Sequence, residues 1–144
     1  MMLTSMGEAQ RRRPNPLILV VEDHPDTQAA VAEYLGQRGF DVEVASHGED
    51  AMRLLREKRP DLVYLDMNLP RISGYEVCEQ IRTDGDLQET GILMTSAQSS
   101  LQVEAFCLEA GADAFLAKPF EIEEVAEQIS RILLARARPP RKAV

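Results

Sequence analysis

The sequence predicts an α/β fold, in which five helices cover the two faces of a doubly wound parallel sheet of five strands. Two observations lead to this prediction. Short apolar runs alternate strictly with segments of helical periodicity, and such alternation implies parallel strands joined by right-handed crossovers. Most of the apolar runs are also continuous, as in strands buried on both faces. The 144 residues leave room for one such domain with a proper core.

The first half of the chain supplies three strands and two helices. Residues 17–23, LILVVED, predict a buried strand that ends in two acids. The helix after it ends at Gly39, which can adopt the left-handed conformation of a cap. Residues 40–45, FDVEVA, alternate apolar and polar side chains, so they predict an edge strand with one wet face. A second helix stops at Pro60, and LVYLD (62–66) is the third strand.

The second half of the chain continues the alternation. Ser73 with Glu76 forms a capping-box pattern that opens a helix, and Ser99 with Gln102 repeats the pattern for the next helix. The last helix carries acids in its first turn and arginines toward its end, as the helix dipole favours. The predicted elements are the helix GYEVCEQIR, the strand GILMTS, the helix LQVEAFCLEAG, the strand AFLA and the last helix.

The formal net charge of −8 is unevenly distributed. Residues 1–13 carry +2 and residues 131–144 carry +5, which leaves −15 for the middle of the chain and argues against a nucleic-acid-binding body. We expect a domain over 16–135 between flexible basic tails at 1–15 and 136–144. The C-terminal tail is alternatively the start of a linker.

The sequence gives no reason to expect membrane insertion or export. No segment is apolar over the length that a bilayer-spanning helix needs, and the N-terminus lacks the apolar core of a secretory signal. Cys78 and Cys107 lie far apart in predicted helices, which favours small buried side chains over a redox or metal role. A cytoplasmic location is the expectation, and reduced thiols agree with it.

Polar side chains end four of the predicted strands. Glu22 and Asp23 follow the first strand, Asp66 ends the third, Ser96 ends the fourth and Lys118 closes the fifth. The carboxyl ends of parallel strands meet at one edge of the sheet, where ligands bind in such folds. If the first and third strands are neighbours, three carboxylates crowd together and require a positive charge. Mg²⁺ meets that requirement, because it takes oxygen ligands and shares phosphate oxygens.

The same residues are the parts that phosphoryl transfer to an aspartate needs. The acid pair holds the metal against a phosphoryl oxygen, Lys118 neutralises a second oxygen, and the Ser96 hydroxyl donates to a third. Asp66 attacks in line as the nucleophile. None of these residues alone indicates phosphoryl transfer, but their joint occurrence at four strand ends does.

Four segments carry a resemblance to a known family. LILVVED, DLVYLDMNLPRISGYEV, ILMTSA and GADAFLAKPF resemble the receiver domain of bacterial two-component response regulators, and the likeness runs from about Leu17 to Leu134. The resemblance implies a flavodoxin-like fold with strand order 2-1-3-4-5, similar to single-domain chemotaxis regulators. It also implies a cis peptide bond between Lys118 and Pro119.

The resemblance implies a role for each residue at the strand ends. Asp66 is implied as the phosphoacceptor, with Lys118 as the phosphate-binding lysine and Mg²⁺ as the cofactor. Ser96 and Phe115 are implied as the switch hydroxyl and the switch aromatic. Residues two positions beyond Asp66 and Ser96 tune dephosphorylation in relatives, and we hypothesise the same for Asn68 and Gln98. The implied metal ligands are Glu22, Asp23, Asp66 and the backbone carbonyl of Asn68.

The sequence departs from the family pattern at three places. Glu22 stands where aspartate is commoner, and its longer side chain reaches a metal directly or through water. Phe115 stands where tyrosine is commoner, so a switch would work by burial of the ring alone. Many relatives that dimerise through the fourth helix, fifth strand and fifth helix carry a base in that helix and paired acids in GADD. Here SSLQVEAFCLEA has no base and Ala114 breaks the acid pair, so that dimer is not expected.

The expected function is a phosphorylation-dependent switch in a two-component phosphorelay, not an enzyme that turns over a substrate. A histidine kinase or histidine phosphotransfer protein would supply the phosphoryl group. A protein partner would bind the face of the fourth helix, fifth strand and fifth helix, since the sequence ends soon after that helix and we expect no output domain. One alternative is a receiver domain excised from a longer regulator or hybrid kinase. A weaker alternative is an aspartyl-phosphate-type hydrolase, a class that needs a second aspartate where Asn68 stands.

Three further residues have ordinary structural interpretations. His24 and His47 are expected in exposed loops, and Tyr64, inside the third strand, is expected to be core packing. A flavin or dinucleotide site is disfavoured because no glycine-rich loop follows the first strand.

Overall fold

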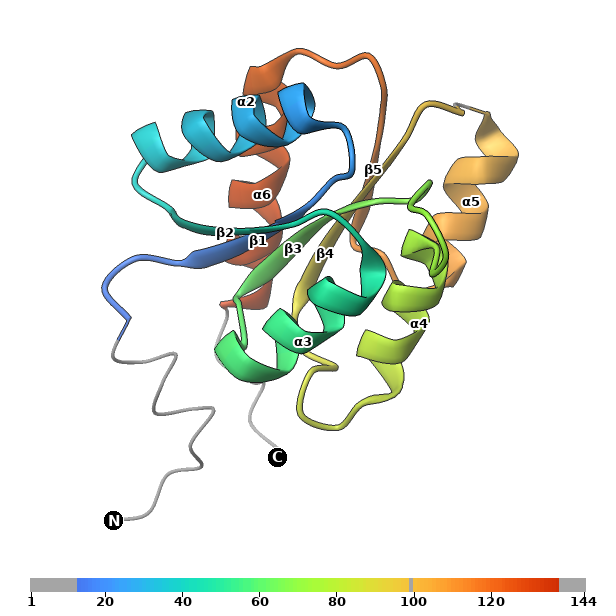
Figure 1. Ribbon diagram of the computed structural model, residues 1–144, viewed down its shortest axis with the longest axis horizontal. Coiled ribbons are helices and arrows are strands. Elements are labelled where there is room, and N and C mark those ends of the chain that lie inside the picture. Colours follow the sequence, from blue (N-terminus) through green and yellow to red (C-terminus); the bar gives the residue numbers. More distant parts are fainter. Residues whose placement is uncertain (1–12, 99, 138–144) are drawn as a thin grey trace, which may run out of the picture.

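The computed structural model describes residues 13–98 and 100–137. A five-stranded parallel sheet with the order β2-β1-β3-β4-β5 forms its centre, and five helices occur in these ranges (Figure 1). The predicted fold class and strand order are therefore confirmed. The strands are β1 (Leu17–Val21), β2 (Asp41–Ala45), β3 (Leu62–Asp66), β4 (Gly91–Ser96) and β5 (Ala114–Ala117). The helices are α2 (Pro25–Gln37), α3 (Gly48–Lys58), α4 (Gly74–Thr83), α5 (Leu101–Glu109) and α6 (Ile122–Arg136).

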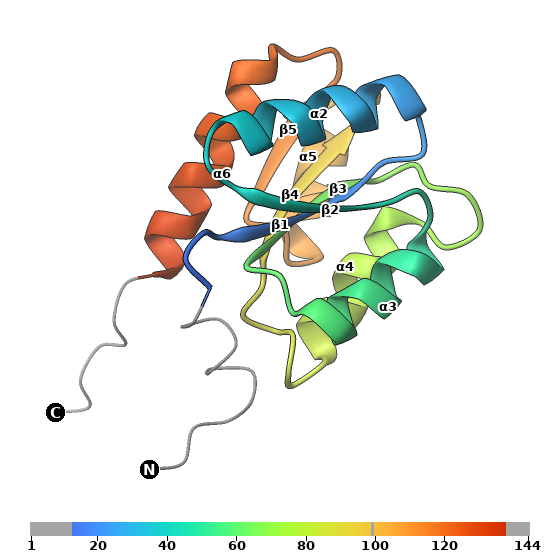
Figure 2. The same ribbon diagram turned by 60° about the vertical axis from the view of Figure 1, so that its left-hand side comes forward.

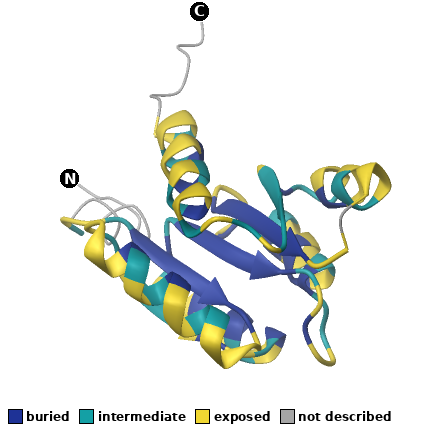
Figure 3. Ribbon diagram, turned by 90° about the horizontal axis from the view of Figure 1, so that it is seen from above, coloured by how far each residue is buried: buried dark blue, intermediate teal, exposed yellow. Residues whose placement is uncertain are grey.

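Helices cover both faces of the sheet (Figure 2). α2 and α6 pack on one face, and α3, α4 and α5 pack on the other. Every residue of β1, β3 and β4 is buried, and Figure 3 shows the strands as the dark interior of the molecule. Ile18 and Val20 of β1 therefore belong to the core under α2 and α6, while Leu19 and Val21 belong to the core on the opposite face.

The edge strand β2 follows the predicted alternation only in part. Phe40 and Val42 pack against the core under α2 and α6, as the alternation predicts. Val44 is 42% exposed, whereas its neighbour Ala45 is buried in the opposite core. The expectation that Val44 is buried is wrong, because the edge position of β2 leaves this side chain open to solvent.

Side-chain caps open four of the helices. The capping box of Ser73 and Glu76 at the start of α4 is confirmed, with both reciprocal hydrogen bonds present. At α5 the cap is Ser100, whose hydroxyl accepts from the backbone N–H of Val103 at 3.1 Å. The predicted cap, Ser99, lies outside the described residues, and the prediction was one residue early because two serines stand side by side.

The two histidines cap helices as well. His24 and His47 are the N-caps of α2 and α3, and each ring Nδ1 accepts a backbone N–H from the third residue of its helix at 3.3 Å. The expected exposed position is found for His24, whereas His47 is half-buried, and the capping role of both side chains was not predicted. A ring nitrogen can replace the usual hydroxyl or carboxylate acceptor because it also carries a lone pair.

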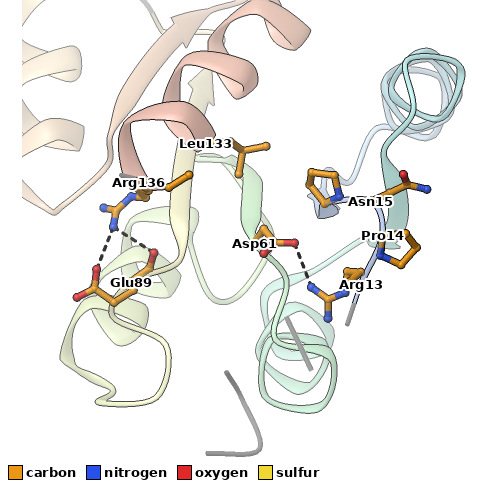
Figure 4. A pocket seen from close by; sticks show the side chains of 9 residues that line it. Arg13, Pro14, Asn15, Asp61, Glu89, Leu133 and Arg136 are labelled. Carbon is orange, nitrogen blue, oxygen red and sulfur yellow. Dashed lines mark hydrogen bonds and ion pairs between the residues drawn. The ribbon is translucent and has the colours of Figure 1, made fainter. Parts of the chain in front are cut away.

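Residues near both limits of the domain bind residues at the end of the sheet where the strands begin. The expected tails fall mostly on residues 1–12 and 138–144, which lie outside the described ranges. Arg13 forms an ion pair with Asp61 at 3.0 Å, and Arg136 donates to the backbone carbonyl of Glu89 at 3.1 Å (Figure 4). These residues line one shallow cavity of about 380 Å³.

Both cysteines are buried free thiols in the core under α3, α4 and α5, as the sequence predicts. Burial raises the pKa of the Cys78 thiol to about 11. Over 13–98 and 100–137, no helix combines the length and apolarity needed to cross a membrane.

Candidate active site

The strand order brings three carboxylates together at the carboxyl end of the sheet. β1 pairs in parallel with β3, so Glu22 and Asp23, which follow β1, lie beside Asp66 at the end of β3. Oxygen atoms of the three side chains all lie within 4.8 Å of one another. They border a cavity of about 340 Å³, whose lining residues are Glu22, Asp23, His24, Thr27, Asp66, Asn68, Ala97 and Lys118.

Lys118 is the cation that faces these acids. Its Nζ donates to Glu22 Oε1 at 2.8 Å and to Asp66 Oδ2 at 3.2 Å. Burial opposes the charge on Lys118, but the hydrogen bond to Glu22 and the charge of Asp66 outweigh it and raise its pKa. The peptide bond from Lys118 to Pro119 is cis, as the resemblance implied.

Glu22 is the most enclosed of the three acids. Its side chain is fully buried, while Asp66 is 4% exposed and Asp23 is exposed. Burial raises the pKa of Glu22, and the hydrogen bond from Lys118 offsets only part of that effect. The enclosed acids and the open Asp23 together form a pocket with one closed and one solvent-facing side.

The backbone around Asp66 holds its carboxylate in place. Asp66 Oδ1 accepts the backbone N–H of Asn68 at 3.0 Å, so each of its two oxygens has one donor. The turn into α4 passes so close that a Cβ built on Gly74 would collide with the carbonyl oxygen of Asp66. The glycine in the segment RISGYEV is therefore needed for this close approach.

The side chains of Ser96 and Asn68 are hydrogen-bonded to each other beside the acids. The buried Ser96 hydroxyl donates to Asn68 Oδ1 at 3.0 Å and accepts the backbone N–H of Gln98 at the same distance. The structure thus places Asn68 at the cavity. Gln98 is exposed and is absent from the residues that line the cavity.

Phe115 lies apart from this cluster. It is half-buried in β5, paired in register with Met94, and packs against the core under α3, α4 and α5. Ser96 is two positions further along β4, paired with Ala117. Phe115 borders a separate hollow next to α5 together with Leu101 and Glu104.

Tyr64 is a residue of the site that the sequence interpretation missed. Its fully buried hydroxyl donates to Glu22 Oε1 at 3.0 Å. Burial and the neighbouring Glu22 carboxylate raise the pKa of Tyr64 far above its usual range, so the phenol keeps its proton. The strand period carried a usable signal, because Tyr64 and Asp66 are two residues apart and share one face of β3.

The donor set suits a hard divalent cation. Three carboxylates face one ammonium group, so the cluster has an excess of negative charge, and all its ligand atoms are oxygens. Oxygen ligands with open positions for water and phosphate are what Mg²⁺ selects, whereas soft metals favour sulfur or imidazole. The residues present therefore fit Mg²⁺.

Comparison with known proteins agrees with this geometry. The family model of the response regulator receiver domain matches residues 18–130. The response regulator MprA of Mycolicibacterium vanbaalenii is 40% identical over 122 residues, which cover 85% of this chain and 52% of that protein. The chain thus spans about half the length of the curated relatives it matches.

Solved structures share the fold over nearly their whole length. A putative response regulator from Chloroflexus aurantiacus has a TM-score of 0.80 at 32% identity, covering 83% of this chain and 98% of that one. The receiver domain of sensor histidine kinase PA1611 from Pseudomonas aeruginosa has a TM-score of 0.76 at 29% identity, with the same coverage of both chains, and holds a magnesium ion in its active site cleft. By the family match, the fold and the acidic cleft, this chain belongs to the response regulator receiver domain family.

Proposed function

We propose that this protein is a phosphorylation-dependent switch that accepts a phosphoryl group on Asp66. The observation that supports this most directly is the position of Asp66 at a strand end, 3.2 Å from Lys118 Nζ and within 4.8 Å of the Glu22 and Asp23 oxygens. The donor is a histidine kinase or a histidine phosphotransfer protein, the partners of receiver domains in two-component systems. The cleft of the receiver is open to such a partner at Asp23, whose side chain is exposed.

Glu22, Asp23, Asp66 and the backbone carbonyl of Asn68 are the proposed Mg²⁺ ligands. When bound, Mg²⁺ supplies positive charge against a phosphoryl oxygen. Lys118 is placed to neutralise a second oxygen, since its ammonium already lies beside Asp66. In this proposal the Ser96 hydroxyl donates to a third oxygen after giving up its hydrogen bond to Asn68.

The transfer step forms one bond and breaks one. A carboxylate oxygen of Asp66 attacks phosphorus, and the phosphorus–nitrogen bond of the donor phosphohistidine breaks as the phosphorus–oxygen bond forms. The departing imidazole takes up a proton from water. The chain contributes orientation, because the backbone N–H of Asn68 and Lys118 each hold one oxygen of Asp66.

The proposed conformational change begins at Ser96 and is transmitted to Phe115. Phosphorylation would draw the Ser96 hydroxyl from Asn68 toward the phosphoryl group, and the ring of Phe115 would follow toward the sheet, since it is only half-buried and borders a hollow beside α5. The surface of α5, β5 and α6 would change shape. Leu101 of α5 is exposed there beside Phe115, and a protein partner is the proposed reader of this face.

We propose that Asn68 and Gln98 set the rate at which phosphorylated Asp66 is dephosphorylated. Asn68 lines the cavity, and Gln98, which does not line it, donates its backbone N–H to the Ser96 hydroxyl that is bonded to Asn68. We expect a changed lifetime of phosphorylated Asp66 when both are replaced by alanine. An unchanged lifetime would remove this part of the proposal.

Two readings of the whole chain follow. In the first the receiver acts alone through its protein partner, without contact to nucleic acid. In the second it is the receiver part of a longer regulator or hybrid kinase; the matched segment makes up 52% of MprA. In both we propose a cytoplasmic location, where the two buried thiols stay reduced.

Catalysis is limited in this proposal to phosphorylation and dephosphorylation of the protein itself. A hydrolase of the aspartyl-phosphate type needs an acid where Asn68 stands, and here the Asn68 side chain is bound to Ser96. Turnover of a phosphate ester by the purified protein would support that class instead.

The test is mass measurement after incubation with Mg²⁺ and a small phosphodonor. Wild type should gain one alkali-labile phosphoryl group, and Asp66→Asn should gain none, because the amide is not a nucleophile of this kind. Asp86→Asn, an exposed aspartate far along the chain, is the matched control and should be modified like wild type. A wild type that stays unmodified would contradict the proposed function.

A further inference from the structure

We infer that Tyr64 is a positioning residue for the metal-binding carboxylates: its buried hydroxyl fixes the long side chain of Glu22 so that one carboxylate oxygen is left for the cation. The inference rests on the proposed Mg²⁺ site and adds to it a residue that touches neither the metal nor the phosphoryl group.

The fold aims the Tyr64 hydroxyl at the acid pair. Tyr64 and Asp66 share the face of β3 that is covered by α2 and α6, and Glu22 follows β1, the neighbour of β3. The phenol hydroxyl ends 3.0 Å from Glu22 Oε1. Both side chains are fully buried, so water does not compete for this hydrogen bond.

The ring that carries the hydroxyl is itself held firmly. It is the largest fully buried side chain of the described residues and lies in the core under α2 and α6. Phe120, just after the cis Lys118–Pro119 bond, packs edge-on against it, with the ring centroids 6.4 Å apart and the planes at 85°. A ring fixed in this way holds its hydroxyl at one place.

The two oxygens of Glu22 have different surroundings. Oε1 accepts from both the Tyr64 hydroxyl and Lys118 Nζ, at 3.0 and 2.8 Å. Oε2 accepts only the backbone N–H of His24, at 3.3 Å, among the hydrogen bonds of the described residues. Oε1 is therefore committed to the protein, and Oε2 keeps room for a cation without any rotation of the carboxylate.

The contact depends on the length of Glu22. An aspartate at this position would withdraw the carboxylate by one carbon–carbon bond, about 1.5 Å. The hydroxyl would then lie beyond hydrogen-bond distance, which ends near 3.5 Å. Tyr64 can act on the metal site only when a glutamate stands at position 22, so the two residues form a matched pair.

This dependence gives a double-mutant test on the full chain. Mg²⁺ alone is titrated by calorimetry into wild type, Tyr64→Phe, Glu22→Asp and the double variant. Tyr64→Phe keeps the ring and its packing, and should weaken Mg²⁺ binding about tenfold, as loss of a partner of a metal ligand does. In the Glu22→Asp background the same change should alter the Kd by less than about twofold.

Tyr34→Phe is the matched control. The exposed hydroxyl of Tyr34, a residue of α2, accepts from Arg38 just after that helix, and its removal should leave the Kd unchanged. Circular dichroism checks that all variants are folded. A Tyr64→Phe protein that binds Mg²⁺ like wild type, or one that loses equal affinity in both backgrounds, would overturn the inference. A wild type that binds no Mg²⁺ at all would instead overturn the proposed metal site, so the two failures are distinguishable.

Discussion

Lys118 is the partner of the two buried carboxylates at the strand ends. Glu22 and Asp66 are both nearly inaccessible to water, and each receives a hydrogen bond from the same ammonium group. A buried carboxylate without a partner is costly, so the lysine stabilises the metal-free fold in addition to its proposed role with phosphate.

We expect Lys118→Met to lower the free energy of unfolding of the metal-free protein at neutral pH. Because Lys118 is 21% exposed and partly screened, the expected loss is about 2 kcal/mol. Lys58→Met is the control: this lysine is 48% exposed and lies 3.8 Å from Glu43, so its loss should cost no more than about 0.5 kcal/mol. Urea denaturation monitors both, and equal effects would contradict this account.

Cys78 should be unreactive in the folded protein. With a pKa raised to about 11 by burial, only about one Cys78 thiol in a thousand is ionised at pH 8, and only the thiolate attacks a disulfide reagent. We expect negligible labelling at pH 8 without denaturant and two labelled cysteines per chain in guanidinium, measured by absorbance of the released thiol. Rapid labelling of the native protein would show that α4, which carries Cys78, unfolds locally more often than the burial of this thiol indicates.

The sequence was informative for those residues whose chemistry depends on charge. Asp66, Lys118 and the acid pair could be predicted because charged residues at the ends of apolar strands are unusual. Tyr64 could not, because a tyrosine in a buried strand normally packs in the core, and only the distance to Glu22 reveals the second role of its hydroxyl.

The turn between β3 and α4 is the most constrained connection around the site. Gly74 donates its N–H to the carbonyl of Met67 at 2.9 Å, which brings its Cα against the backbone of Asp66. The atoms nearest to a Cβ here are backbone atoms, which cannot rotate away as a side chain would.

Gly74→Ala should therefore destabilise the protein by about 2–3 kcal/mol, the usual cost of overpacking, and slow phosphorylation by displacing Asp66. Gly36→Ala is the matched control, since a Cβ at that helical position meets nothing within 4 Å. That change should stabilise α2 by about 0.5–1 kcal/mol. Thermal unfolding and phosphoryl incorporation measure both effects; a neutral Gly74→Ala would mean that the turn adjusts.

Periodicity predicted the strands and helices and their order, but it predicted less well where each of them begins and ends. The order of strands and helices follows from alternating apolar patterns, which extend over many residues. The start of α5 depends on which of two adjacent serines adopts the extended conformation, and the solvation of Val44 depends on the position of β2 at the sheet edge. Those outcomes are set by tertiary contacts that no local pattern encodes.

Over the whole molecule, the two edges of the sheet have opposite electrostatic character. The carboxyl end holds acids in excess over its one lysine, whereas Asp61 and Asp113 at the other end are paired with arginines. There Asp113 Oδ2 accepts from Arg82, Arg136 and the backbone N–H of Ile92, at 3.1, 3.0 and 2.8 Å. One carboxylate thus ties α4, α6 and β4 to the start of β5.

Asp113→Ala should cost about 2 kcal/mol of unfolding free energy, because it removes charge-assisted bonds and leaves the Ile92 N–H without its acceptor. Phosphorylation of Asp66 at the opposite edge should keep its rate. Asp86→Ala is the control, since Asp86 is 71% exposed and lies 3.4 Å from Arg59; its loss should change stability by less than about 0.5 kcal/mol. A slower phosphorylation of Asp113→Ala would indicate coupling between the two edges.

The sheet order also has a consequence for the protein as it is synthesised. All three carboxylates are present once residue 66 has been made, and β1 and β3 can then pair. Lys118 is made 52 residues after Asp66, on the last strand to join the sheet. A nascent chain or a truncated fragment that ends before Lys118 therefore carries an assembled acidic edge without its cation. Pairing of β5 with β4 adds the final strand and brings in the cation that pairs with Glu22 and Asp66 in one event, which favours completing the domain over persisting as a partial sheet.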